Sequence, residues 1–165
     1  MGPAQLWLGS TSGSDAGLRF DLAAKVYLND TLVGSGELDS VPGGTSSFQN
    51  ATRDVVPLTL VAPVPVSSGQ ILSILVMVRN ACSGSTQNSG AARLWYNGLS
   101  LDSGPGRDAG SRFDASIGGS GLSYFLRNGL VLTTTGGSSR TYVDTAVGAP
   151  CGTFLPLGDW ATTLP

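Results

Sequence analysis

The residues best suited to chemistry are the aspartates of a seven-residue sequence that occurs twice. Residues 15–21 read DAGLRFD and residues 108–114 read DAGSRFD. An acidic loop that leads into a strand could offer carboxylate and carbonyl oxygens to Ca²⁺, a hard cation that takes six to eight oxygen ligands. No cofactor other than this calcium ion is suggested. The candidate donors are Asp15, Asp21, Asp102, Asp108 and Asp114.

The same repeat has a structural interpretation that needs no ion. Each aspartate could close a turn, Phe20 and Phe113 could enter the core, and each arginine could pair with a neighbouring aspartate. Neither an EF-hand nor an RTX pattern is complete. The structural interpretation is therefore favoured over the calcium site, and because the flanking sequences differ, the repeat does not indicate a duplicated domain.

Catalysis is poorly supported by the residue types present. The sequence contains no histidine, which excludes a Ser-His-Asp triad and every imidazole-based metal site. No Gly-x-Ser-x-Gly elbow leads into a helix, and the aspartates lie mostly in turn-like segments rather than as a glycosidase-like pair. We therefore expect a protein that is not an enzyme.

Aromatic side chains on polar strand faces suggest carbohydrate binding instead. Trp7 alternates with apolar neighbours, Tyr27 shares a face with Lys25, and Trp95 shares a face with Arg93. A ring can stack on the apolar face of a sugar while nearby polar groups bond its hydroxyls. The alternative is that these rings cover sheet faces beneath loops or neighbouring domains. The candidate ligand-binding residues are Trp95, Arg93, Tyr27 and Trp7.

These side chains must be positioned by strands. From Leu18 to Leu28 the even positions are apolar and the odd positions mostly polar, as in a strand with one face on the core. The segment Leu32–Leu38 continues the pattern after an interruption at residues 29–31. A three-residue loop there would align the apolar sets of a hairpin, whose buried face would contain Leu22, Leu28, Leu32 and Leu38.

Turn residues separate further short segments of strand character, and no segment has a helical period. One of them, Ile71–Arg79, is apolar at both parities and is expected to be a central strand covered on both faces. The pattern predicts an all-β fold, an antiparallel jelly-roll-like β-sandwich of about 8–10 strands. The other expected strands are Gln5–Gly9, Val55–Val61, Ala91–Tyr96, Arg112–Ile117, Tyr124–Thr133, Thr141–Thr145 and Thr153–Thr162.

Composition bounds the remaining possibilities. The length of 165 residues predicts a single domain over 1–165, with residues 1–4 as a leading segment or linker. A net charge of −2 argues against a nucleic-acid partner, which would require a basic surface. The longest apolar run, Ile71–Val78, is too short for membrane insertion. Cys82 and Cys151 lie outside any CxxC motif, and a disulfide between them in an oxidising compartment is favoured over two buried thiols.

Several stretches of the sequence resemble a β-sandwich module of large exported bacterial surface proteins. They are LWLG at 6–9, DAGLRFDL at 15–22, VYLN at 26–29, LVGSG at 32–36, RLWY at 93–96 and LGDW at 157–160. The resemblance covers most of the chain and implies an extracellular or cell-surface accessory module within a longer polypeptide. It implies no functional residue.

Together these observations predict a non-catalytic extracellular module that binds glycan or mediates surface attachment. Its partners would be a polysaccharide or cell-surface glycan and the neighbouring domains of a longer chain. The alternative is a structural or self-assembling domain with no small ligand, which would be recognised by a long unpaired apolar edge strand.

Overall fold

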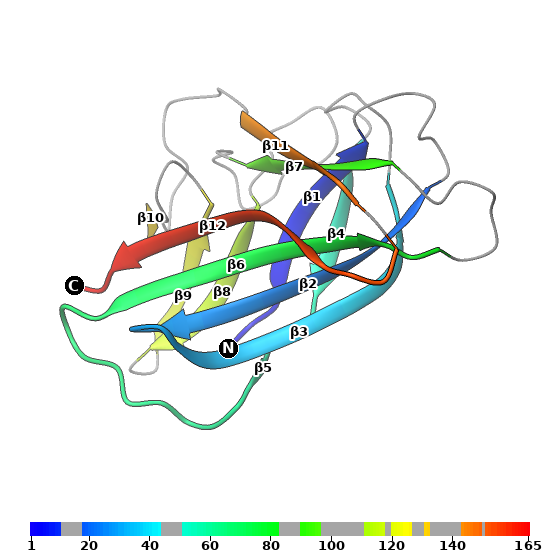
Figure 1. Ribbon diagram of the computed structural model, residues 1–165. Helices are drawn as coiled ribbons and strands as arrows, with labels where there is room; N and C mark the ends of the chain where they lie inside the picture. Colours follow the sequence, from blue (N-terminus) through cyan, green and yellow to red (C-terminus); the bar gives the residue numbers. More distant parts are fainter. Residues whose placement is uncertain are drawn as a thin grey trace.

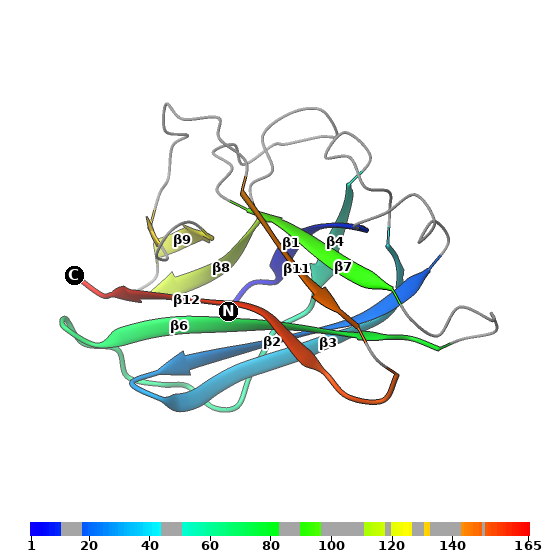
Figure 2. The ribbon, with the colours of Figure 1, turned by 45° about the horizontal axis from the view of Figure 1, so that its top comes forward.

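The chain forms two antiparallel β-sheets packed face to face (Figures 1 and 2). This computed structural model describes residues 1–10, 18–43, 51–82, 90–96, 111–117, 120–126, 131–132, 143–149 and 151–165. Within those ranges the regular secondary structure is all strand. The fold is therefore the all-β antiparallel sandwich that the sequence predicts.

The larger sheet, sheet A, is built around β1 (Ala4–Ser10). One edge of β1 pairs with β4 (Thr52–Val56). Its other edge pairs with β8 (Arg112–Ile117) at the start of the strand and with β7 (Ala91–Tyr96) at the end. The sheet continues outward from these strands through β9 (Ser120–Phe125), β10 (Val131–Leu132) and β11 (Val143–Gly148).

The smaller sheet, sheet B, contains the two alternating segments at 18–28 and 32–38 as β2 (Arg19–Leu28) and β3 (Thr31–Pro42). Its order is β12-β6-β2-β3-β5. The central strand β6 was expected to be covered on both faces, but its outward side chains are half-buried and Ile71 is 51% exposed. The bounds of these strands are Leu155–Thr163, Ile71–Asn80, Arg19–Leu28, Thr31–Pro42 and Thr59–Leu60.

The core lies between the two sheets and follows the alternation of the strands. Leu6 and Leu8 of sheet A and Phe20 and Leu22 of sheet B are fully buried. Phe113, the second phenylalanine of the repeat, is also fully buried and stacks on Tyr124 with ring centroids 5.0 Å apart. Both repeats thus place a phenylalanine in the core, one from each sheet.

The β2–β3 hairpin differs from the expected one in its loop. The strands are joined by a two-residue turn in which Asn29 (φ 47°) and Asp30 (φ 64°) are both left-handed, as a type I′ turn requires. Such a turn alone would put the apolar sets out of step. A bulge restores the phase, because Val33 is an extra residue between the pairs Val26–Gly34 and Tyr27–Leu32.

The bulge corrects the predicted buried face of the hairpin. Leu22 and Leu28 are buried and Leu38 packs partly buried against the core, as expected. Leu32 is instead 39% exposed, and Val33 takes the inward position with 5% exposure.

Two expected strands are in fact pairs of strands. The segment Val55–Val61 is divided at Pro57, so that β4 joins sheet A and β5 joins sheet B. Proline lacks the N–H needed to continue a ladder, which explains the division. The segment Tyr124–Thr133 is likewise divided into the end of β9 and the antiparallel β10.

The first four residues pack against the domain rather than extending from it as a linker would. The Gly2 N–H donates to the Asp114 carbonyl at 2.7 Å, and the Asp114 N–H donates to the Pro3 carbonyl at 3.2 Å. Ala4 begins β1 and is fully buried.

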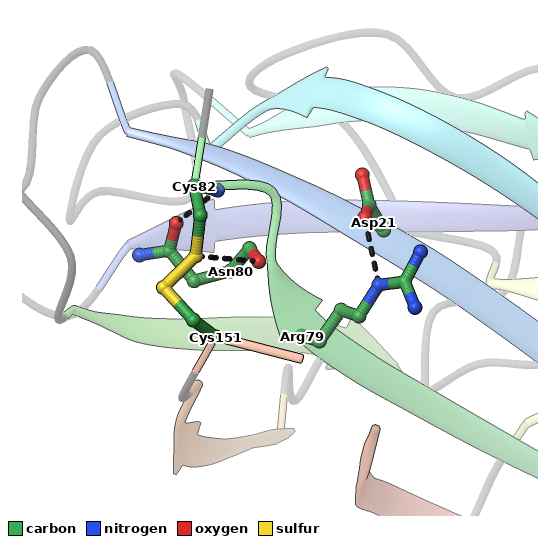
Figure 3. Close-up of a disulfide and its surroundings, with 5 residues drawn as sticks. All are labelled: Asp21, Arg79, Asn80, Cys82 and Cys151. Atoms are coloured by element: carbon green, nitrogen blue, oxygen red, sulfur yellow. Dashed lines mark hydrogen bonds and ion pairs between the residues drawn. A yellow bond between two sulfur atoms is a disulfide. The ribbon is translucent and has the colours of Figure 1, made fainter. Parts of the chain in front are cut away.

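The predicted disulfide between Cys82 and Cys151 is confirmed (Figure 3). The two Cα atoms are 5.9 Å apart, within the usual range for a disulfide. Cys82 follows the end of β6 and its N–H donates to the side-chain oxygen of Asn80 at 2.8 Å. Leu155 at the start of β12 pairs with Val78 near the end of β6, so the disulfide lies beside the end of β6 and the start of β12.

Candidate functional site

A second, small apolar cluster lies on the outer face of sheet A, away from the sandwich core. It consists of Trp7, Trp95 and Ala51. Trp7 and Trp95 are directly opposite each other on β1 and β7, so their rings share one face of the sheet. The prediction that both tryptophans point away from the core is confirmed. Trp7 is only 2% exposed, however, so the expectation of an exposed ring is wrong for this residue.

The two tryptophans are held in register by the hydroxyl of Ser111, which is fully buried. It accepts a hydrogen bond from the backbone N–H of Trp7 at 3.0 Å and donates one to the backbone carbonyl oxygen of Trp95. Ser111 lies just before β8, at the point along β1 where the pairing partner changes from β8 to β7. Its hydroxyl lies between the Trp7 N–H and the Trp95 carbonyl and takes the place of a direct hydrogen bond between the two strands. Sequence reasoning did not single out Ser111. The available signal was that it is the only position at which the two repeats differ, with Leu18 in the first copy.

Arginines flank this tryptophan pair. The guanidinium carbon of Arg93 lies 5.3 Å from the centroid of the Trp95 ring, within range of a cation–π contact. Both side chains are half-buried. On the other side, Arg53 of β4 is opposite Trp7 in the register and is exposed. Arg53 is therefore the most accessible side chain around the tryptophan pair, and Trp95 and Arg93 are partly accessible.

Further along the same face, the second repeat supplies an ion pair. Arg112 Nε lies 3.3 Å from Asp114 Oδ1, and Gln5 Nε2 donates to Asp114 Oδ2 at 3.3 Å. Arg112 is 7% exposed although it points away from the core. The predicted pairing of arginine and aspartate within the repeat is confirmed here.

The fourth candidate, Tyr27, is not part of this cluster. It lies half-buried on the outer face of sheet B, where it pairs across the sheet with Ser73 and Leu32. The outer faces of the two sheets are on opposite sides of the sandwich (Figure 2). The structure therefore brings Trp95, Arg93 and Trp7 together and leaves Tyr27 on the opposite side.

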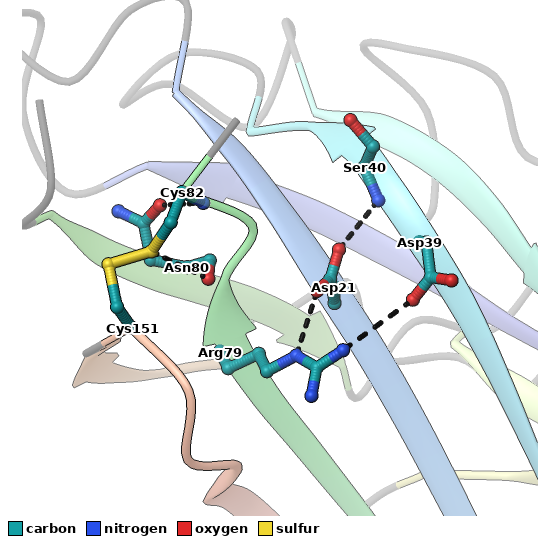
Figure 4. Close-up of polar contacts among 7 residues, drawn as sticks. All are labelled: Asp21, Asp39, Ser40, Arg79, Asn80, Cys82 and Cys151. Carbon is teal, nitrogen blue, oxygen red and sulfur yellow. Dashed lines mark hydrogen bonds and ion pairs between the residues drawn. A yellow bond between two sulfur atoms is a disulfide. The ribbon is translucent and has the colours of Figure 1, made fainter. Parts of the chain in front are cut away.

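The first repeat contributes a charged network to the outer face of sheet B (Figure 4). Asp21 Oδ2 accepts a hydrogen bond from Arg79 Nε at 2.8 Å, and its Oδ1 accepts one from the Ser40 N–H at 2.8 Å. A second bulge of β3 opposite Asp21, with Ser40 at φ 56°, turns that N–H toward the carboxylate. The hydrogen bond from Arg79 to Asp21 raises the pKa of Arg79. The guanidinium carbon of Arg79 lies 4.4 Å from the centroid of the Phe154 ring.

Of the candidate calcium ligands, the two that the structure describes, Asp21 and Asp114, do not come together. Asp21 and Asp114 lie on different sheets, and each carboxylate is engaged by an arginine and by a further hydrogen bond. Asp15, Asp102 and Asp108 lie outside the described residues. Within the described part of the chain, no group of three acidic or cysteine side chains could hold a metal ion.

One carboxylate that sequence reasoning missed is buried on the core side of sheet A. Asp54 of β4 is opposite Leu6 and is 7% exposed. Burial raises its pKa from 3.8 to about 6, while the hydrogen bond from the Thr52 hydroxyl, at 3.2 Å, opposes this effect. Among the described strands β4 pairs with β1 alone, and an inward charge on an edge strand is a known guard against pairing with another chain.

A small apolar cavity opens between the sheets at the end of the sandwich near the β2–β3 turn. Its volume is about 90 Å³. None of its described lining residues has a charged side chain to orient a ligand, and among them only Ser116 has a polar side chain. We therefore assign the cavity to the packing of the sandwich end. The lining includes Leu28, Val33, Leu72, Phe113 and Leu164.

Comparison of the chain with protein-family models, with curated proteins and with solved structures finds no match. The described residues include no helix long and apolar enough to cross a membrane. The function must therefore be argued from the surface of the sandwich itself.

Proposed function

We propose that this chain is a non-catalytic, extracellular accessory module that binds glycan through the outer face of sheet A. One observation carries the proposal: a tryptophan pair lies outside the core, with an arginine on each side. A tryptophan that only filled the sandwich core would not need arginines beside it. The buried ring of Trp7 supports the half-buried ring of Trp95, which is the side chain offered to the sugar.

The chemistry of the accessible groups fits a sugar. An indole ring presents a broad apolar face that can stack on the C–H groups of a pyranose, and guanidinium groups donate to its oxygens in a fixed geometry. A shallow site of this kind competes with water for every hydroxyl. We therefore expect dissociation constants in the micromolar to millimolar range, about −8 to −4 kcal/mol.

The disulfide supports an extracellular location as part of the same proposal. Cys82 and Cys151 are both exposed, so a reducing compartment would have ready access to the bond. Disulfides of this kind persist in oxidising environments such as the cell exterior. A location in the medium or on the cell surface is also where polysaccharide ligands are found.

A glycan array at high ligand density tests the proposal. The wild-type protein should bind at least one glycan class, and Trp95→Ala should abolish that binding. Because Trp95 packs on Trp7, the melting temperature of the variant must be measured in parallel, and Trp95→Phe, which keeps a smaller ring, should retain part of the binding. Tyr27→Ala, on the opposite face, is the matched control and should bind normally. An array with no signal for the wild-type protein would refute glycan binding.

The alternative, a structural or self-assembling domain, has one observation in its favour. Exposed apolar side chains gather at the end of the sandwich near the β2–β3 turn. Light scattering over a range of protein concentrations tests this alternative. Val61, which is 67% exposed, is the most exposed of these side chains, and Val61→Ser should weaken self-association through this end. The exposed residues are Leu32, Leu60, Val61, Val66 and Ile71.

Assembly through three of the described edge strands, β4, β5 and β12, is disfavoured by their sequences. β4 carries the inward Asp54 and the exposed Arg53. β5 has two residues and lies between Pro57 and Pro63. β12 is interrupted by Pro156 and a bulge. Each of these features blocks the addition of another strand, so a long unpaired apolar edge is not present among these three strands.

A further inference from the structure

β11 is an edge strand of sheet A, and its outer side pairs with no other strand that the structure describes (Figure 1). The strand contains no proline and its register with β7 has no bulge. Its one charged residue, Asp144, lies opposite the outward-facing Trp95 and is therefore not an inward charge. β10, at the other end of the sheet, has only two residues. Of the described edge strands, β11 is therefore the longest that lacks these guards against strand addition.

The ladder between β7 and β11 determines which backbone groups of β11 face the open side. The Ala149 N–H donates to the Gly90 carbonyl at 2.9 Å, which extends the register of the two strands by one residue. Hydrogen-bonded residues alternate with non-bonded ones along an antiparallel pair. The carbonyl of Trp95 agrees with this alternation, because it is bonded to the Ser111 hydroxyl and not to Asp144 opposite it. The residues whose N–H and carbonyl groups face away from β7 are therefore Asp144, Ala146 and Gly148.

These three outward residues are arranged symmetrically about Ala146. If two copies pair antiparallel on a two-fold axis at Ala146, Asp144 of each copy lies opposite Gly148 of the other. Each opposed pair can then exchange two backbone hydrogen bonds. The two Asp144 residues are separated by about 13 Å along the joined strands, so no acid opposes another. Gly148 has no side chain, and nothing lies within 4 Å of a Cβ atom built there.

We propose that the outer edge of β11 is an interaction surface for a second copy of this chain, which joins the two copies of sheet A by β11–β11 pairing. The match between the two edges identifies the partner, because identical strands present their outward groups at the same spacing and keep their acids apart. The contact involves a strand of only 6 residues from each copy. An interface this small gives a weak dimer that forms and dissociates with protein concentration. The inference does not depend on glycan binding.

The symmetry of this dimer has a consequence for the tryptophan pair. The two-fold axis is perpendicular to the joined sheet, so the outer faces of both copies point to the same side. The two β7 strands are three strand spacings apart, about 14 Å. The dimer therefore presents two copies of the Trp7–Trp95 pair on one side.

Sedimentation velocity over a range of protein concentrations tests the proposal. The wild-type protein should dimerise reversibly, and Ala146→Pro should be monomeric at concentrations at which the wild type is dimeric. Proline at this position removes an N–H that faces the open side and leaves the hydrogen bonds to β7 in place. The melting temperature of the variant, measured in parallel, shows whether it is folded.

Two charge variants of Gly148 test the register without proline. Gly148→Lys would lie opposite Asp144 of the second copy and should tighten the dimer. Gly148→Asp would oppose the same carboxylate and should weaken the dimer about ten-fold, since two such pairs form in each dimer. Both effects should shrink in added salt. Gly121→Asp in β9 is the matched control, because it is also exposed, has nothing within 4 Å of the added Cβ atom and gives the same net charge.

Each other outcome overturns the inference in a recognisable way. A wild-type protein that stays monomeric at millimolar concentration would overturn it and leave glycan binding untouched. A dimer that persists in Ala146→Pro and is lost in Val61→Ser would associate through the apolar end of the sandwich instead. Equal weakening by Gly148→Lys and Gly148→Asp would contradict the symmetric register, and equal weakening by Gly121→Asp would show repulsion by net charge. If Ala146→Pro does not fold, the two Gly148 variants decide.

Discussion

At the scale of single residues, Asp54 is a described side chain whose burial makes the stability of the fold depend on pH. Its pKa in the folded protein, about 6, lies above the ordinary value of 3.8. Below the ordinary value both the folded and unfolded chains are protonated there, so burial carries no penalty. As pH rises between the two values the unfolded chain loses its proton first, and the free energy of unfolding falls. Above pH 6 the penalty is complete, at about 3 kcal/mol or less.

Asp54→Asn should therefore stabilise the protein at neutral pH and not at low pH. The amide keeps an oxygen that can accept the Thr52 hydroxyl and removes the buried charge. Urea unfolding at a series of pH values should show a gain of about 2 kcal/mol above pH 7 that shrinks to nearly zero near pH 3. Asp159→Asn, at an exposed position of β12, is the control. Two parallel stability curves for wild type and Asp54→Asn would contradict the assigned burial penalty.

The candidate site was only partly predictable at this scale. Alternation identified Trp7 and Trp95 as outward-facing because Leu6 and Leu94 are their apolar neighbours. Alternation does not say what covers an outer face, and so it could not distinguish the buried Trp7 from the half-buried Trp95. Ser111 was missed because a hydroxyl that replaces a ladder bond depends on two strands diverging, which no local pattern records.

At the scale of elements, the phase of a strand pattern proved less secure than the presence of the strand. β2 begins and ends within one residue of its expected bounds. In β3 the single extra residue Val33 reversed the orientation of Leu32, because side chains alternate strictly and one inserted residue moves the rest to the other face. The sequence shows apolar residues at both 32 and 33, so either could have been the inward one.

The crossing from β4 to β5 depends on Gly36. A Cβ atom at this position would overlap the carbonyl oxygen of Pro57, which passes close to β3 as the chain moves from sheet A to sheet B. Gly36→Ala should therefore destabilise the fold by about 2 kcal/mol or more, since backbone rather than a flexible side chain must shift. Gly148→Ala in β11 is the matched control, because nothing lies within 4 Å of the added atom. Thermal melting of the two variants compares them directly, and equal melting temperatures would contradict the close approach.

At the scale of the whole molecule, the assignment of strands to sheets is what local patterns could not supply. The fold class followed from many short alternating segments separated by turns. The division of residues 55–61 between two sheets, and the placement of Trp95 and Tyr27 on opposite outer faces, depend on long-range pairing. Only the strand pairing shows that Trp7 and Trp95 lie together on sheet A and that Tyr27 lies on the other sheet.

The disulfide acts at this largest scale, because it encloses most of sheet A in one covalent loop. Cys82 and Cys151 are 69 residues apart, and β7 to β11 lie between them. Closing such a loop restricts the unfolded chain and should contribute about 4 kcal/mol on the chain-entropy model. The double variant Cys82→Ser/Cys151→Ser should lose about this much in urea unfolding, and reduced wild-type protein should lose the same amount. If the double variant were destabilised and the reduced protein were not, the loss would come from the serines and not from the missing cross-link.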